Sequence, residues 1–123
     1  MSNRPIHFEL GVVEPERAVK FYESVFGWKS MKWDGPMPYW LVTTGAENEP
    51  GINGGIMIHQ DAQPRTVNTI GVENVDDFAA KVMAAGGQVV VPKMAIPGIG
   101  WQAYCLDTEG NLFGIHQMDV NAK

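Results

Sequence analysis

The stretch "PIHFELGVVEPERAVKFYESVFG", residues 5–27, decides the fold because a strand pattern in it passes directly into a helix pattern. Residues 5–12 alternate between apolar and polar side chains, as expected of a strand with one face turned to a core. Pro15 favours the first turn of a helix, and Gly27 favours its end. We therefore predict a strand followed at once by an amphipathic helix.

The same order returns in the second half of the chain. "LGVVE" at 10–14 resembles "IGVEN" at 70–74, and each precedes a helical pattern, the second one over residues 74–87. The other predicted strands are 28–33, 39–44, 54–60, 67–72, 88–92, 101–106 and 111–118. Each half then forms one β-α-β-β-β unit, and neither can bury its sheet alone.

These patterns predict an α+β fold made of two β-α-β-β-β units, about 5–60 and about 66–118, in a single domain over residues 1–123. We expect a curved mixed sheet with the helices on its convex face and a concave surface opposite. Residues 94–100, "MAIPGIG", are expected to form an apolar loop, either a lid over a ligand or part of a subunit interface.

Composition limits the partners. The formal net charge is −5 and no cluster of Lys and Arg occurs, which argues against nucleic acid. No apolar run is long enough to span a bilayer, and residues 1–10 lack the pattern of a secretory signal. The single cysteine, Cys105, fits a reducing compartment, so we expect a cytoplasmic protein.

Two motifs resemble those of the vicinal-oxygen-chelate superfamily, which includes glyoxalases, extradiol dioxygenases and bleomycin-resistance proteins. "PERAVKFYESVFGW" is similar to its first helix, and "DTEGNLFGI" is similar to its closing hairpin. In its sequence the chain resembles an uncharacterised, glyoxalase-like branch of this superfamily. The resemblance covers nearly the whole chain and implies a homodimer with pockets near the interface, while the fold itself hosts several chemistries.

The resemblance also implies four metal-ligand positions, and the chain departs from most of them. They fall on His7, Gly55, Val67 and Gly114, of which only His7 can bind a metal. We therefore expect no metal or other cofactor. The alternative is a displaced Zn, Fe or Ni site drawn from His7, Glu9, His59 and His116.

Strand alternation indicates which residues line the concave face. Once Phe8 and Leu10 face the helices, His7 and Glu9 must face the other way. The same reasoning in the other strands, with two aromatic residues as pocket walls, gives the expected substrate-binding residues: Gly55, Met57, His59, Trp101, Tyr104, Gly114 and His116. Tyr104 belongs to this face if Leu106 pairs with Leu112, which would turn Cys105 into the core.

The glycines and the polar pair leave several functions open. Gly55 and Gly114 are expected to form a pocket floor that a ligand approaches, so added bulk at Gly114 should cost little stability. The first hypothesis is a small-molecule-binding protein in which His7 and Glu9 only form hydrogen bonds. The alternative is a lyase or isomerase of glyoxalase type acting on a small oxygenated substrate. Glu9 would then abstract a proton beside a carbonyl while His7 polarises the oxygen.

Overall fold

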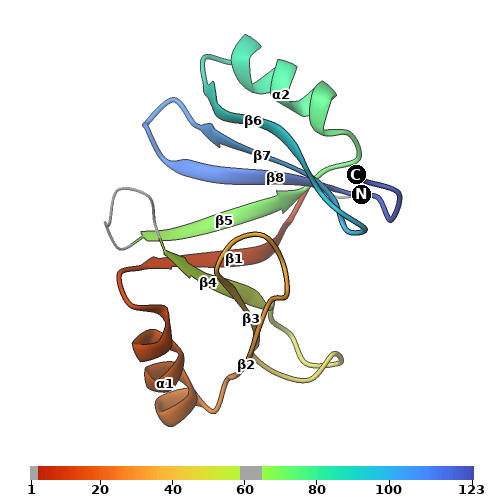
Figure 1. Ribbon diagram of the computed structural model, residues 1–123. Coiled ribbons are helices and arrows are strands. Elements are labelled where there is room, and N and C mark those ends of the chain that lie inside the picture. The colour runs from red at the N-terminus through yellow and green to blue at the C-terminus, as the bar shows by residue number, and fades with distance from the viewer. Residues whose placement is uncertain (1–2, 59–64) are drawn as a thin grey trace. The chain divides into compact units, whose positions relative to one another are not determined.

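The computed structural model describes residues 3–58 and 65–123, and both halves contain the predicted elements in the predicted order. The chain divides into two compact units (Figure 1). We call residues 7–67 the N-terminal unit, and residues 68–123 together with the chain up to Ile6 the C-terminal unit. The α+β class and the two β-α-β-β-β repeats are confirmed.

The sheet of the N-terminal unit mixes parallel and antiparallel pairs. Its elements are β1 (Pro5–Val12), α1 (Pro15–Phe26), β2 (Lys29–Lys32), β3 (Tyr39–Thr43) and β4 (Gly54–Ile58). The strand order is β2-β3-β4-β1, with β1 parallel to β4 and the other pairs antiparallel. Glu9 lies opposite Gly55 in the parallel pair, so the Glu9 side chain points to the face on which Gly55 leaves the backbone uncovered by a side chain.

Helix α1 packs on the other face of this sheet through aromatic side chains. The rings of Tyr22 and Trp28 stack at 4.7 Å, and Phe8 of β1 lies 5.7 Å from Trp28. Gly27 ends the helix in the left-handed region at φ 74°, where its N–H binds the carbonyl of Glu23. Because Phe8 faces the helix, His7 and Glu9 face away from it, as predicted.

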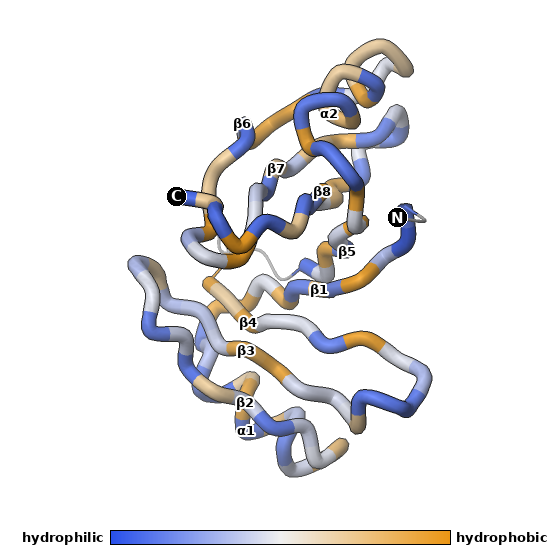
Figure 2. Tube along the Cα trace, turned by 90° about the vertical axis from the view of Figure 1, so that its right-hand side faces the viewer, coloured by the Kyte–Doolittle hydropathy of each residue, from blue (hydrophilic) through white to orange (hydrophobic). Residues whose placement is uncertain are grey.

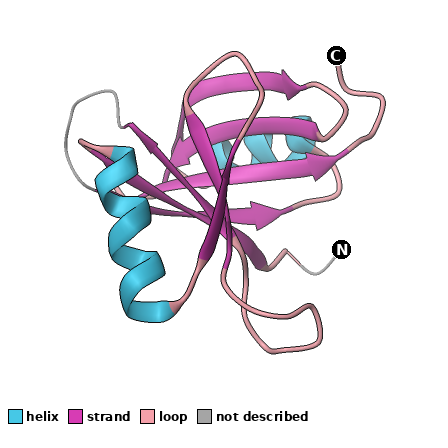
Figure 3. Cartoon of the chain, turned by 60° about the horizontal axis from the view of Figure 1, so that its bottom comes forward, coloured by secondary structure: helices cyan, strands magenta, loops and turns pink. Residues whose placement is uncertain are grey.

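The C-terminal unit has the same composition of elements. They are β5 (Arg65–Gly71), α2 (Val75–Ala84), β6 (Gln88–Ile96), β7 (Gly100–Leu106) and β8 (Leu112–Met118). The strand order is β5-β8-β7-β6, with β5 parallel to β8 and the other two pairs antiparallel (Figure 1). Figure 3 distinguishes the helices, strands and loops of the chain by colour. Leu106 pairs with Leu112, which is the register that the sequence analysis required for Tyr104.

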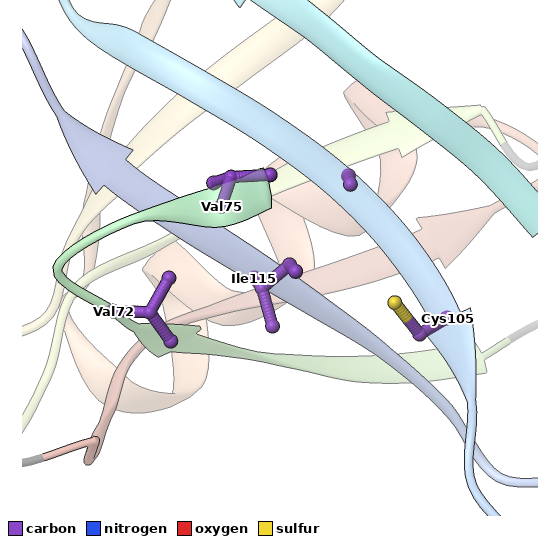
Figure 4. Packing of buried hydrophobic residues seen from close by; sticks show 5 residues of the cluster. Val72, Val75, Cys105 and Ile115 are labelled. Carbon is purple, nitrogen blue, oxygen red and sulfur yellow. The ribbon is translucent and has the colours of Figure 1, made fainter. Parts of the chain in front are cut away.

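A small apolar core fills the space between α2 and its sheet. Its fully buried members are Val72, Val75, Ala103, Cys105 and Ile115 (Figure 4). Helix α2 contains both hydrophobic and hydrophilic residues, as its mixed colours in Figure 2 show, and it contributes Phe78, Ala79 and Val82 to this core. The prediction that Cys105 is a core residue is confirmed, and burial raises the pKa of its thiol.

The predicted loop at residues 94–100 is wrong over its first half. Strand β6 continues through Pro92 to Ile96, and the turn begins only afterwards. The register shifts between Val91 and Met94, so Pro92 lies where the β6–β7 ladder is interrupted and needs no N–H. A proline that usually ends a strand is tolerated here because of this irregularity.

Candidate active site

The open face of the N-terminal sheet carries a chain of three hydrogen-bonded polar side chains. Nε2 of His7 lies 2.8 Å from the Tyr39 hydroxyl, which donates to Oε2 of Glu9 at 2.9 Å. Glu9 is only 8% exposed, so its carboxylate is taken almost entirely out of water. A carboxylate buried to this extent needs hydrogen bonds to its charge, and Tyr39 supplies one of them.

Strand order explains how these residues meet. His7 and Glu9 are two positions apart on β1, so both point to the same face. Tyr39 comes from β3, and β4 lies between these two strands. Tyr39 must therefore reach across β4 to bond with residues of β1.

Gly55 of β4 is what allows this reach. A Cβ atom at Gly55 would overlap the hydroxyl end of the Tyr39 ring. We predicted that a ligand approaches the backbone at this glycine, but the protein's own tyrosine takes the room there. Met57, two residues further along β4, shares this face and pairs with Tyr39.

The environment keeps His7 uncharged at neutral pH. Burial lowers its pKa below the ordinary value of 6.5, since desolvation disfavours the imidazolium. The negative charge of Glu9 acts in the opposite direction but more weakly. A neutral imidazole can accept a proton, and a nearby carboxylate stabilises the cation that results.

A second polar group lies on the C-terminal sheet. Nδ1 of His116 lies 2.8 Å from Oε1 of Gln102, and Nε2 of Gln102 lies 3.5 Å from the Thr69 hydroxyl. Gln102 and Thr69 are both buried. A Cβ atom at Gly114 would lie 2.7 Å from the Gln102 amide nitrogen and 2.8 Å from the Thr69 oxygen.

The space at Gly114 is therefore filled, as it is at Gly55. The expectation that added bulk at Gly114 costs little stability is not supported, because the new side chain would push on two buried polar groups. Tyr104 pairs with Gly114 across β7 and β8, so it lies on the predicted face.

Trp101 does not share that face. It lies an odd number of positions from Tyr104 on β7, and it packs against the core beneath α2. Its indole N–H donates to Asp119 at 3.0 Å. We therefore remove Trp101 from the candidate residues. His59 lies outside the described residues, and a common pocket for the groups of the two sheets stays a prediction.

The residues at the implied metal positions do not fit a metal ion of the family type. Gly55, Val67 and Gly114 have no donor atom, and His7 directs Nε2 to Tyr39 rather than to an open position. In residues 3–58 and 65–123, no three His, Cys, Asp or Glu side chains gather closely enough to hold an ion.

The sequence did not identify Tyr39, Gln102 and Thr69 as members of these groups. The contact of Tyr39 with His7 depends on the pairing of three strands. A signal did exist: Gly55 removes a side chain beside a strand that carries a tyrosine. Gln102 and Thr69 gave no signal of this kind.

Comparison with known proteins identifies the family. The sequence pattern of the Glyoxalase/Bleomycin resistance protein/Dioxygenase superfamily matches residues 4–115. The chain belongs to this superfamily. Among curated glyoxalase-superfamily relatives, "Putative glyoxylase CFP32" of Mycobacterium tuberculosis and of Mycobacterium bovis is 31% identical over 119 residues, covering 92% of the chain. The chain spans about half of these relatives, 45% of their length.

Solved structures share the glyoxalase-superfamily fold at low sequence identity. A Streptomyces coelicolor methylmalonyl-CoA epimerase in complex with 2-nitronate-propionyl-CoA matches with a TM-score of 0.73 and 13% identity, covering 98% of both chains. A hypothetical protein of Bacillus halodurans C-125 matches with a TM-score of 0.73 and 14% identity, covering 100% of this chain and 99% of that one. At these identities the likeness establishes the fold. No helix in the described residues is long and apolar enough to cross a membrane.

Proposed function

We propose that this protein is a metal-independent lyase or isomerase that moves a proton on a small oxygenated substrate. The observation that carries the proposal is the His7–Tyr39–Glu9 chain, in which a neutral imidazole and a buried carboxylate are joined through one phenol. This combination can take a proton from carbon and stabilise the resulting charge.

The proposed step is proton transfer next to a carbonyl group. The C–H bond breaks, its electron pair moves into the adjacent carbonyl to give an enolate, and the acid–base group holds the proton. Return of the proton to carbon completes an isomerisation, whereas loss of a leaving group from the enolate completes a lyase reaction. That superfamily neighbours include epimerases is compatible with this class of chemistry.

The experiment follows deuterium exchange at carbon. Protein in deuterated buffer is incubated with pyruvate, dihydroxyacetone or a simple acetyl thioester, and loss of the C–H signal is followed by proton NMR. We expect accelerated exchange of at least one probe. Glu9→Gln should slow it by about 10²–10⁴-fold, the usual contribution of acid–base catalysis.

Glu16→Gln is the matched control, since it removes an exposed carboxylate on α1 and should leave exchange unchanged. Absence of exchange for every probe would contradict the proposed reaction. So would equal exchange by Glu9→Gln and the parent protein.

A pure binding function is the second candidate, and one observation favours it. Tyr39 bonds both His7 and Glu9, so a network within the protein already supplies partners for these polar side chains. A thermal-shift screen with small carbonyl compounds and aromatic compounds would separate the two functions. If the protein only binds neutral ligands, the compounds that stabilise the parent protein should also stabilise Glu9→Gln. In that case no probe should exchange its C–H hydrogen for deuterium.

We also propose that the protein acts in the cytoplasm as a homodimer. The single, buried Cys105 fits a reducing compartment. The dimer is supported by large apolar side chains that remain exposed on α1, with Phe21 at 56% and Phe26 at 61%.

A further inference from the structure

The direction of the hydrogen bonds in the His7–Tyr39–Glu9 chain determines where His7 carries its proton. A phenol has a single proton to donate, and the Tyr39 hydroxyl donates it to Oε2 of Glu9. An ionised carboxylate can only accept, so this bond cannot run the other way. Tyr39 must then accept from His7, which requires a proton on Nε2 at the 2.8 Å contact.

We propose that Tyr39 is a positioning residue that holds neutral His7 in its Nε2–H tautomer, so that Nδ1 accepts the substrate's proton. The second half of this inference rests on the proposed function. In the described part of the chain the His7 ring makes one hydrogen bond, through Nε2. Nδ1 is therefore the ring nitrogen available to a ligand.

This assignment reverses the roles expected from sequence. Glu9 has little exposed surface and is bonded to Tyr39, so it is poorly placed to meet a substrate. His7 Nδ1 takes the proton, and the ring becomes a cation that still donates through Nε2 to Tyr39. Glu9 keeps its charge and stabilises that cation through the phenol, as the carboxylate does in other carboxylate–imidazole pairs.

The neighbouring glycine lets Tyr39 reach this position. The phenol end lies directly over Gly55, in space that a side chain there would fill. A phenol held by hydrogen bonds to both His7 and Glu9 orients the imidazole before the reaction begins, which lowers the cost of reorganisation during proton transfer.

The test is the nitrogen-15 NMR spectrum of protein labelled in its three histidines. Comparison with His7→Gln identifies the His7 signals. At neutral pH the His7 Nδ1 signal should lie in the range of an unprotonated ring nitrogen and Nε2 in that of a protonated one. In Tyr39→Phe the two signals should move towards each other as the tautomers exchange.

Tyr22→Phe is the matched control. It also removes one hydroxyl from the N-terminal unit, but its ring stacks on Trp28 on the helix side, so the His7 signals should not move. A proton found on Nδ1 of His7 in the parent protein overturns the inference even if Tyr39→Phe does not fold. An unchanged Nε2–H tautomer in Tyr39→Phe also overturns it.

The experiments distinguish failure of the proposed reaction from failure of the role proposed for Tyr39. With an exchanging probe, Tyr39→Phe should slow exchange about tenfold or more, since a misoriented base loses part of its acid–base contribution. If the spectrum is as expected but no probe exchanges, the proposed reaction fails and only the tautomer assignment stands. If a probe exchanges while Nδ1 carries the proton, the role given to Tyr39 fails and the reaction stands.

Discussion

At the scale of the residue, His7 is a group whose charge the fold controls. Its pKa in the folded protein is below 6.5, mainly through desolvation, while the unfolded chain keeps the ordinary value. The unfolded state therefore binds more protons as the pH falls below 6.5, and the free energy of unfolding decreases. Neutral His7 makes its full contribution to the free energy of unfolding above pH 6.5. That contribution is lost as the pH falls towards the lower pKa that His7 has in the folded protein.

Urea denaturation above and below pH 6.5 measures this effect. We expect His7→Gln to have a shallower decrease in the free energy of unfolding over that range than the parent protein. A decrease of the same size in both proteins would show that other groups cause it.

The contact between Gly55 and Tyr39 gives a second prediction at this scale. Gly55→Ala should lower the free energy of unfolding by about 1–3 kcal/mol, because the new Cβ overlaps the phenol end. In the Tyr39→Ala background the same substitution should cost less, which a double-mutant cycle measures as a coupling energy. Gly45→Ala is the control, since its Cβ would meet only the end of the flexible Glu49 side chain.

At the scale of the element, the two helices begin differently. Asn74 precedes α2, and its Oδ1 accepts the Asp77 N–H at 2.9 Å. Glu14 precedes α1 without a side-chain cap and forms an exposed ion pair with Arg17. Asn74→Ala should therefore cost about 1 kcal/mol in urea denaturation, and Glu14→Ala much less. Equal costs at the two positions would contradict this explanation.

Periodicity predicted most elements because each one repeats its apolar positions locally. It failed at Pro92, where an interrupted ladder removes the usual penalty for proline. It also placed Trp101 and Tyr104 together, although their odd spacing on β7 puts them on opposite faces. Tyr39 was not predicted in the polar chain because its partners depend on strand order, which no local pattern encodes.

At the scale of the whole molecule, the exposed apolar face of α1 suggests how copies would associate. Phe21, Val25 and Phe26 are each more than half exposed. We expect light scattering to show a homodimer at high micromolar concentration. Phe21→Lys combined with Phe26→Lys should give a monomer with an unchanged circular-dichroism spectrum.

Lys20→Gln is the control on the same helix and should remain dimeric. A parent protein that scatters as a monomer would rule out the dimer. A double variant that stays dimeric would show that the contact lies elsewhere.

The position of Tyr39 across β4 also has a consequence for refolding. The polar chain requires β3, β4 and β1 in their native order, and the parallel β1–β4 pair joins segments that are far apart in sequence. Pairings of this kind form slowly, because a long loop must close before any contact is gained. Helical circular dichroism should therefore recover before the His7 nitrogen signals do. Recovery of the Nε2–H tautomer of His7 would then report the time at which the last of these three strands pairs.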